Sequence, residues 1–228
     1  MKIGVLGSGM VGQAISAKLA ELGHDVWIGT RDVAALMART TPGETPTFAS
    51  WLAHHSAVEV ASFAQTAAHG DLLFNATSGT VSLAALRLAG EENLAGKVLI
   101  DVANPLDFSH GVVSLSVCNT DSLGEQIQRA FPQVKVVKTL NTMTARLMVN
   151  PHLLADGDHT VFVSGNDAAA KAQVIDILQN WFGWRDVIDL GDIDGARGME
   201  MILPLWLELF DKLHTSMIGF KVTRRSSV

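Results

Sequence analysis

The chain opens with Met1-Lys-Ile-Gly-Val-Leu-Gly-Ser-Gly-Met-Val-Gly12, in which a short apolar strand runs directly into the pattern Gly7-x-Gly9-x-x-Gly12. A helical pattern over residues 10–22 follows. In such a turn the first glycine permits the sharp exit from the strand, the second leaves room for a pyrophosphate, and the third lets the helix pack closely on the strand. The free N–H groups and the positive dipole end of the helix would hold that pyrophosphate. The stretch therefore predicts a dinucleotide site.

The end of the second strand, predicted over residues 25–29, indicates which dinucleotide binds. Folds specific for NAD place an Asp or Glu there to hold the ribose 2′-hydroxyl, whereas this chain has Thr30 and Arg31. A guanidinium binds a 2′-phosphate through charge-assisted hydrogen bonds, and a carboxylate would repel it. We therefore predict NADP(H) as the cofactor. The adjacent Asp32 is interpreted as the N-cap of a helix over residues 33–39, with the ribose as its alternative partner.

Apolar strand-like runs alternate with helical patterns along the rest of the chain, which is typical of a doubly wound α/β fold with a mostly parallel sheet and a C-terminal helical segment. We expect one Rossmann-like domain over residues 1–228, made of a dinucleotide-binding core (1–140) and an extension (141–228) that completes the acceptor pocket. Later strands are predicted at residues 58–61, 72–76, 97–102, 134–139, 160–164 and 187–190. Later helices are predicted near residues 48–54, up to 69, and at 81–88, 123–131 and 167–182.

Ligands of such sheets lie outside the carboxyl ends of the strands. This rule predicts that the path from adenosine to nicotinamide is lined, after two of the strands, by Ala76, Thr77, Ser78, Ala103, Asn104 and Pro105. Asn141 follows the next strand, and we expect its amide to face the reacting end and to anchor a carboxamide or a substrate oxygen. For Asn104 and Asn141 the alternative is a turn residue that bonds its own backbone.

Composition excludes several classes of partner. The net charge of −6 argues against nucleic acid or an anionic membrane, since both need a basic face. No run reaches the roughly eighteen apolar residues of a membrane span, and the N-terminal stretch lacks a cleavage-site pattern. The single cysteine, Cys118, cannot form an internal disulfide, so we expect a cytoplasmic protein and interpret this thiol as a small buried hydrophobe.

The last long segment, residues 198–220, spaces its apolar side chains three or four residues apart and predicts one shared helical face. Core packing or a subunit interface is the interpretation of this stripe, and a planar-cofactor pocket is the alternative. Pro204 should kink or break the helix because it lacks an N–H. The stripe consists of Met199, Ile202, Trp206, Leu209, Leu213, Met217 and Phe220.

Missing residues narrow the chemistry. The chain has no tyrosine, which excludes the Tyr–Lys acid/base pair of short-chain dehydrogenases. We expect no metal site, because His54 and His55 are adjacent rather than four apart, and Asp192-x-Asp194 lacks the other ligands of a calcium loop. His110 alone follows a ligand-side turn, and a structural role is the simpler interpretation.

Five segments together resemble the coenzyme F420-dependent NADP oxidoreductase family, and the likeness covers essentially the whole chain. They are the glycine turn, Gly29-Thr-Arg31, Asp101-Val-Ala-Asn-Pro105, Val137-Lys-Thr-Leu-Asn-Thr142 and Val163-Ser-Gly-Asn-Asp167. The resemblance implies a Rossmann-like protein, often a homodimer, in which NADP(H) exchanges hydride with a deazaflavin (coenzyme F420). It implies that Ser8, Met10, Val11, Thr30 and Arg31 bind the adenosine and phosphate parts, with Asn104, Pro105 and Asn141 near the nicotinamide.

The family often has a further lysine just beyond the arginine, where this chain has Ala34 and Ala35. Ferric reductases and proteins with a flavin acceptor share the family fold, so the acceptor stays open between a deazaflavin and a flavin. Hydride transfer between stacked rings needs orientation rather than a proton donor, which agrees with the lack of an evident acid/base residue. Two alternatives remain. One is a dehydrogenase of the 3-hydroxyacid type, for which Lys171 is the candidate base, although a surface lysine is the simpler interpretation of that residue. The other is a non-enzymatic NADP(H)-sensing protein.

Overall fold

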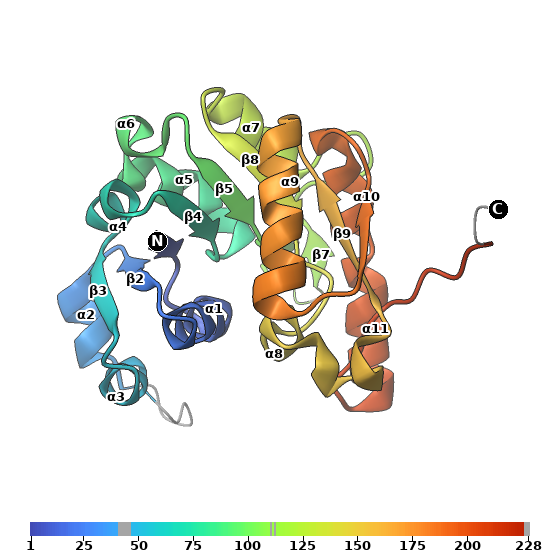
Figure 1. The fold of residues 1–228 in the computed structure, drawn as a ribbon, viewed down its shortest axis with the longest axis horizontal. Helices are drawn as coiled ribbons and strands as arrows, with labels where there is room; N and C mark the ends of the chain where they lie inside the picture. Colours follow the sequence, from blue (N-terminus) through green and yellow to red (C-terminus); the bar gives the residue numbers. More distant parts are fainter. Residues whose placement is uncertain (41–46, 110, 112, 226–228) are drawn as a thin grey trace.

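The computed structural model describes residues 1–40, 47–109, 111 and 113–225. Eight of its strands form one sheet in the order β10-β9-β8-β5-β4-β1-β2-β3, and a short hairpin pairs β6 with β7 (Figure 1). The strands are β1 Lys2–Leu6, β2 Asp25–Thr30, β3 Val58–Ser62, β4 Leu72–Asn75, β5 Val98–Asp101, β6 Leu106–Asp107, β7 Ser114–Leu115, β8 Lys135–Thr139, β9 Thr160–Ser164 and β10 Asp186–Asp189.

The sheet is mostly parallel, which confirms the predicted fold class. Strands β3, β2, β1, β4, β5 and β8 run in one direction. β9 pairs with β8 in the antiparallel sense, and β10 is parallel to β9. The carboxyl ends of β1, β2, β4, β5 and β8 therefore meet at one edge of the sheet. A doubly wound sheet binds its ligands at this edge.

Helices cover both faces of the sheet (Figure 1). Side chains of α1, α8 and α9 pack on one face, as Ile15, Leu147 and Val174 do. Those of α4, α5, α7 and α10 pack on the other, as Ala67 and Leu86 do. The helices are α1 Met10–Glu21, α2 Val33–Ala38, α3 Phe48–His54, α4 Phe63–His69, α5 Gly79–Ala89, α6 Glu91–Leu94, α7 Leu123–Ala130, α8 Ala145–Val149, α9 Ala168–Asp176, α10 Ala196–Met201 and α11 Leu203–Leu213.

Strand β1 illustrates why a parallel sheet forms here. Its residues Ile3, Val5 and Leu6 are fully buried and face the two apolar layers in alternation. Strands covered on both faces need such continuous apolar runs. The predicted helix over residues 167–182 is also present, as α9 followed by a π-helical turn over Ile177–Phe182.

The C-terminal segment departs from the prediction in part. Pro204 does interrupt the helix: α10 ends at Met201, and α11 restarts at Leu203 with the proline in its first turn, where the missing N–H is tolerated. The prediction of one face extending to residue 220 is wrong. His214 adopts a left-handed conformation (φ 52°) that ends α11, so the last two residues of the apolar stripe lie outside it.

Candidate functional site

The glycine turn between β1 and α1 is closely packed around two glycines and open at the third. Gly7 has a φ of 117°, and a Cβ there would meet the Ala76 carbonyl oxygen at 2.4 Å. A Cβ on Gly12 would lie 1.8 Å from the carbonyl oxygen of Gly7. A Cβ on Gly9, by contrast, would have nothing within 4 Å. The turn thus leaves free space in front of the helix at the position where the sequence predicts a pyrophosphate.

The start of α1 suits an anion. Gly9 is its N-cap and supplies no side chain to bond the first N–H groups, and no acidic residue lies in the first turn. The exposed Met10 begins the helix, preceded by the half-buried Ser8. Free N–H groups at the start of a twelve-residue helix form a ready anion site.

The end of β2 presents an unpaired cation. Arg31 is exposed, and within the described part of the chain no carboxylate pairs with it. The half-buried Thr30 ends β2. Asp32 accepts a hydrogen bond from the Ala35 N–H at 2.9 Å and is the N-cap of α2, as predicted. The guanidinium is therefore free to bind a ligand, while the neighbouring carboxylate is engaged in the helix cap.

A cavity of about 220 Å³ lies at the carboxyl ends of β4 and β5. Six of the residues predicted from the sequence line it: Val11, Ala76, Thr77, Ser78, Ala103 and Asn104. Its other lining residues are Gly79, Val102, Leu106, Phe108, Met143 and Met148, which the sequence did not single out. The lining residues that the structure describes present hydroxyl, amide and apolar groups, and none of them has a titratable side chain.

The loop after β5 and the start of α5 touch closely at this cavity. A Cβ on Gly79 would lie 2.0 Å from the carbonyl oxygen of Asn104, so no larger residue fits there without moving the loop. Pro105 is buried behind the loop, and its carbonyl accepts the Ser116 N–H at 2.8 Å. That hydrogen bond ties the β6–β7 hairpin to the site. The hairpin was missed because two-residue strands leave no periodic pattern in a sequence.

Asn104 and Asn141, which the sequence placed near the reacting end, bind one another. The Asn141 Nδ2 donates to the Asn104 Oδ1 at 2.9 Å and to the carbonyl oxygen of Met199 at 2.8 Å. The Asn104 Nδ2 donates to the Asn141 carbonyl at 2.8 Å. Asn141 is 1% exposed and Asn104 is half-buried at the cavity wall. The amide of Asn141 thus links β8, the loop after β5 and α10, and its Oδ1 has no hydrogen-bond partner among the residues that the structure describes.

A fully buried charged group lies beneath the same loop. The Lys138 Nζ contacts carboxylate oxygens of Asp101 at 2.9 Å and of Glu200 at 2.8 Å. Burial opposes the charge of Lys138, but the Asp101 and Glu200 carboxylates outweigh burial and raise the pKa of the lysine above its ordinary value. Sequence reasoning passed over these residues, although a lysine inside a central strand was a detectable signal because lysine is almost never fully buried unpaired.

Two other residues discussed from the sequence, Lys171 and Cys118, do not line the cavity. Lys171 is buried rather than a surface residue: its Nζ bonds the Asp189 carboxylate and the Gly191 carbonyl, which leaves it remote from the cavity lining. Cys118 is exposed, so its interpretation as a buried hydrophobe is wrong: in the irregular stretch after β7 it is the adjacent Val117 that packs on an apolar layer, and Cys118 belongs to neither layer. His110 and residues 41–46 lie outside the described residues.

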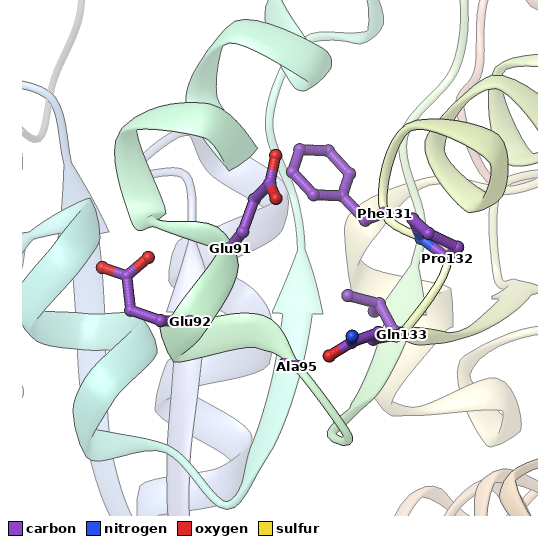
Figure 2. A pocket seen from close by; sticks show the side chains of 7 residues that line it. Glu91, Glu92, Ala95, Phe131, Pro132 and Gln133 are labelled. Carbon is purple, nitrogen blue, oxygen red and sulfur yellow. The ribbon is translucent and has the colours of Figure 1, made fainter.

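A second cavity, of about 180 Å³, lies at the amino ends of β5 and β8, before each strand begins. Figure 2 shows Glu91 and Glu92 on one wall and Phe131, Pro132 and Gln133 on the other. Two carboxylates without a cation in the lining would repel the phosphates of a dinucleotide. The edge of the sheet that carries the glycine turn is therefore the better candidate.

Residues 1–40, 47–109, 111 and 113–225 contain no group of three or more His, Cys, Asp or Glu arranged to hold a metal ion. No helix in the same ranges has the length and apolar character needed to cross a membrane.

Comparison with known proteins identifies the family. A family model described as coenzyme F420-dependent NADP oxidoreductase matches residues 2–105. A crystal structure described as a candidate F420-dependent NADP reductase from Arthrobacter sp. FB24 shares 59% sequence identity, with a TM-score of 0.94, over 98% of this chain and 100% of that one.

Two curated relatives are more distant. The F420-dependent NADP reductase of Methanocaldococcus jannaschii is 28% identical over 159 residues, which is 69% of this chain and 70% of the relative. Metalloreductase STEAP3 of Rattus norvegicus is 29% identical over 210 residues, which is 90% of this chain but 38% of the relative. The chain thus spans less than two fifths of that metalloreductase. Together with the glycine turn and the cavity beside it, these matches show that the chain belongs to the coenzyme F420-dependent NADP oxidoreductase family.

Proposed function

We propose that this protein transfers a hydride between NADP(H), held at the carboxyl edge of the sheet, and a deazaflavin or flavin acceptor. The observation that carries the proposal is the cavity after β4 and β5, whose wall joins the glycine turn and whose described lining residues include no titratable group. When bound, the nicotinamide ring supplies the chemistry, because it gives up or accepts the hydride. The protein then has to orient the rings and exclude water rather than move a proton.

The residues present fit a dinucleotide phosphate along this edge. The open space at Gly9 and the uncapped N–H groups of α1 suit the pyrophosphate. The unpaired guanidinium of Arg31 suits a 2′-phosphate, with Thr30 beside it. Thr77 and Ser78 would flank the path toward the nicotinamide end. The pyrophosphate and the 2′-phosphate would thus each meet a group of matching charge or shape.

The acceptor side of the cavity is apolar. Leu106 and Phe108 on the β6–β7 hairpin line it together with Met143 and Met148. The two methionines belong to the extension over residues 141–228, which we propose completes the acceptor pocket of a single domain. A planar, largely neutral ring suits this wall better than a charged chelate. The candidate base of a 3-hydroxyacid dehydrogenase, Lys171, is by contrast engaged elsewhere.

Replacing the arginine at the end of β2 tests the cofactor assignment. We expect Arg31→Ala to weaken NADPH binding by about ten- to a hundredfold, because it removes a charge-assisted contact worth about 1.5–3 kcal/mol. NADH binding should change little, since NADH has no 2′-phosphate. Calorimetric titration of both cofactors measures the two effects.

Arg39→Ala is the matched control, because Arg39 is likewise exposed but lies at the far end of α2. It should leave both affinities near the parent values. Equal losses for NADPH and NADH in Arg31→Ala would contradict the assignment of Arg31 to the 2′-phosphate.

We further propose that the protein forms a homodimer through α11. This helix exposes Leu205 (52%), Phe210 (45%) and Leu213 (59%) along a face that no described element covers, and Phe210 stacks on Trp206. Contiguous exposed apolar side chains of this size mark interaction surfaces. In Figure 1, α11 lies on the opposite side of the molecule from α2 and α3, so a second copy docked there leaves the adenosine side open.

Light scattering on a sizing column tests the dimer. Leu205→Asp should convert the dimer to a monomer, because it buries a charge in the interface, while an acidic residue in the first turn of α11 suits the helix dipole. Leu88→Asp, which changes a leucine of similar exposure (54%) on α5, is the control and should remain dimeric. A parent protein that elutes as a monomer would refute this interface.

A further inference from the structure

The buried group of Lys138, Asp101 and Glu200, hereafter the Lys138 cluster, has no exposed member: the three side chains are 0%, 0% and 1% exposed. The ammonium of Lys138 has three acceptors, one on each carboxylate and the carbonyl oxygen of Ala103. Three N–H bonds thus meet three oxygens, so the charge is fully satisfied.

The acceptors come from two parts of the chain that are distant in sequence, the end of β5 and α10. Asp101 ends β5, Ala103 follows it and lines the cavity, and Glu200 lies on α10. A lysine that joins these three positions fixes the direction in which the chain leaves β5. Ala103 is one residue before Asn104, whose side chain is held by Asn141.

A second branch of hydrogen bonds leads from the Lys138 cluster to another segment of the cavity wall, the one after β4. The Asn75 Nδ2 donates to the Asp101 Oδ1 at 2.8 Å, and the Thr77 Oγ1 donates to the Asn75 Oδ1 at 2.7 Å. Asn75 is fully buried at the end of β4, and Thr77 lines the cavity. The network therefore ends at two lining residues of the cavity, Thr77 and Ala103.

Helix α10 also contributes hydrogen bonds to this network. The Glu200 carboxylate also accepts the N–H groups of Leu123 at 2.8 Å and Gly124 at 3.1 Å, which begin α7. One residue earlier, the Met199 carbonyl accepts from Asn141. Met199 and Glu200, two consecutive residues of α10, are thus linked to the loop after β5 by separate hydrogen bonds. The link from Glu200 passes through Lys138, and the link from Met199 passes through Asn141.

Stability alone does not account for such an arrangement. Burying a group of charged side chains costs several kcal/mol per charge. A protein with apolar residues of similar volume at the same positions is often equally stable or more stable. The strand positions around Lys138 hold buried apolar residues, Val136 and Val137. Packing therefore does not explain a lysine at this position. Its hydrogen bond to Ala103 connects it to the cavity lining.

We propose that the Lys138 cluster positions the reacting end of the site: it holds Ala103 and Thr77, two neighbouring segments of the cavity wall beside which the nicotinamide would lie. The inference rests on the proposed function for the identity of that ring. Lys138 itself touches no ligand in this proposal, because it is buried behind Ala103.

Lys138→Met and Lys171→Met form a matched pair of variants that tests this proposal. Both remove a buried ammonium that bonds a carboxylate and a backbone carbonyl, but only Lys138 adjoins the cavity. We expect Lys138→Met to lower kcat by about 10- to 100-fold, as small misplacements at a reacting centre do. NADPH affinity, which depends mainly on the distant phosphate contacts, should stay within about threefold of the parent value.

Hydrogen–deuterium exchange gives a readout that does not depend on turnover. In Lys138→Met, the amides of residues 76–78 and 102–104 should exchange at least about tenfold faster, while those of the glycine turn stay protected. Lys171→Met should change neither kcat nor the exchange of these segments. Glu200→Gln, which keeps the size of the side chain, is the second variant should Lys138→Met fail to fold, and it should shift both readouts in the same direction.

Two outcomes would overturn the proposal. The Lys138 cluster has no positioning role if kcat and local exchange stay at parent values in Glu200→Gln and Lys138→Met. Its role is merely structural if both lysine variants lower kcat in proportion to their loss of unfolding free energy. Failure of NADPH to bind the parent protein would instead refute the proposed function. The exchange measurement would still decide whether the Lys138 cluster holds residues 76–78 and 102–104 in place.

Discussion

Gly9→Val should abolish NADP(H) binding while the protein still folds. A Cβ at this position meets nothing within 4 Å, so the chain itself tolerates a side chain there. The branched side chain would instead fill the space proposed for the pyrophosphate, directly in front of the first N–H groups of α1. We expect the NADPH dissociation constant to rise by at least about 100-fold, or about 2.7 kcal/mol, in calorimetric titration. Circular dichroism and the thermal midpoint should stay close to those of the parent.

Gly12→Ala should give the opposite result. Its Cβ would lie 1.8 Å from the Gly7 carbonyl oxygen, a contact that forces β1 and α1 apart. We expect a loss of at least about 3 kcal/mol of unfolding free energy, as overpacking against rigid backbone produces. A folded Gly9→Val variant that binds NADPH with parent affinity would show that the turn does not hold the cofactor.

Asn141→Ala should reduce turnover far more than it weakens NADPH binding. The lost amide bonds both the Asn104 side chain and the Met199 carbonyl, so Asn104 loses its support at the cavity wall. A displacement of about 1 Å at a reacting centre costs on the order of a hundredfold in rate. The orphaned groups should also lower the unfolding free energy by about 1–3 kcal/mol. Steady-state rates and NADPH titrations separate the two effects.

The pair of asparagines also permits a double-mutant cycle. Asn104→Ala removes the same link and leaves the Met199 carbonyl paired. If the two amides act as a unit, the double variant should be no slower than Asn141→Ala alone. Additive losses would mean that each asparagine acts separately, and unchanged rates would leave Asn141 as a turn residue only.

The sequence predicted the sheet because local patterns determine it. Buried strands such as β1 and β4 are short apolar runs, and each is followed by a turn and a helix with its own start signal. Asp32 was predicted as an N-cap from a contact that spans three residues. The cavity residues after β4 and β5 follow from topology, since parallel strands end at a common edge.

Contacts between distant elements were not predictable from local patterns. Nothing in the sequence near Asn141 indicates that its amide would bond residues 37 and 58 positions away. The partners of Lys138, on β5 and α10, are equally remote. The end of the last helix at His214 depended on a left-handed backbone conformation, for which a histidine is a weak local signal. Residues that line the cavity could thus be predicted from the sequence, while the buried hydrogen bonds that hold them in place could not.

The most direct measurement of the central claim is NADPH oxidation by the purified protein with a panel of acceptors: a deazaflavin, FMN, FAD and ferric chelates. Absorbance of the reduced nicotinamide reports turnover. The proposed function predicts rapid oxidation with a deazaflavin or flavin, slow oxidation with NADH in place of NADPH, and no need for added metal. Binding of NADPH without turnover on any acceptor would contradict the claim and favour a sensing protein, and turnover on ferric chelates alone would place the activity with metalloreductases.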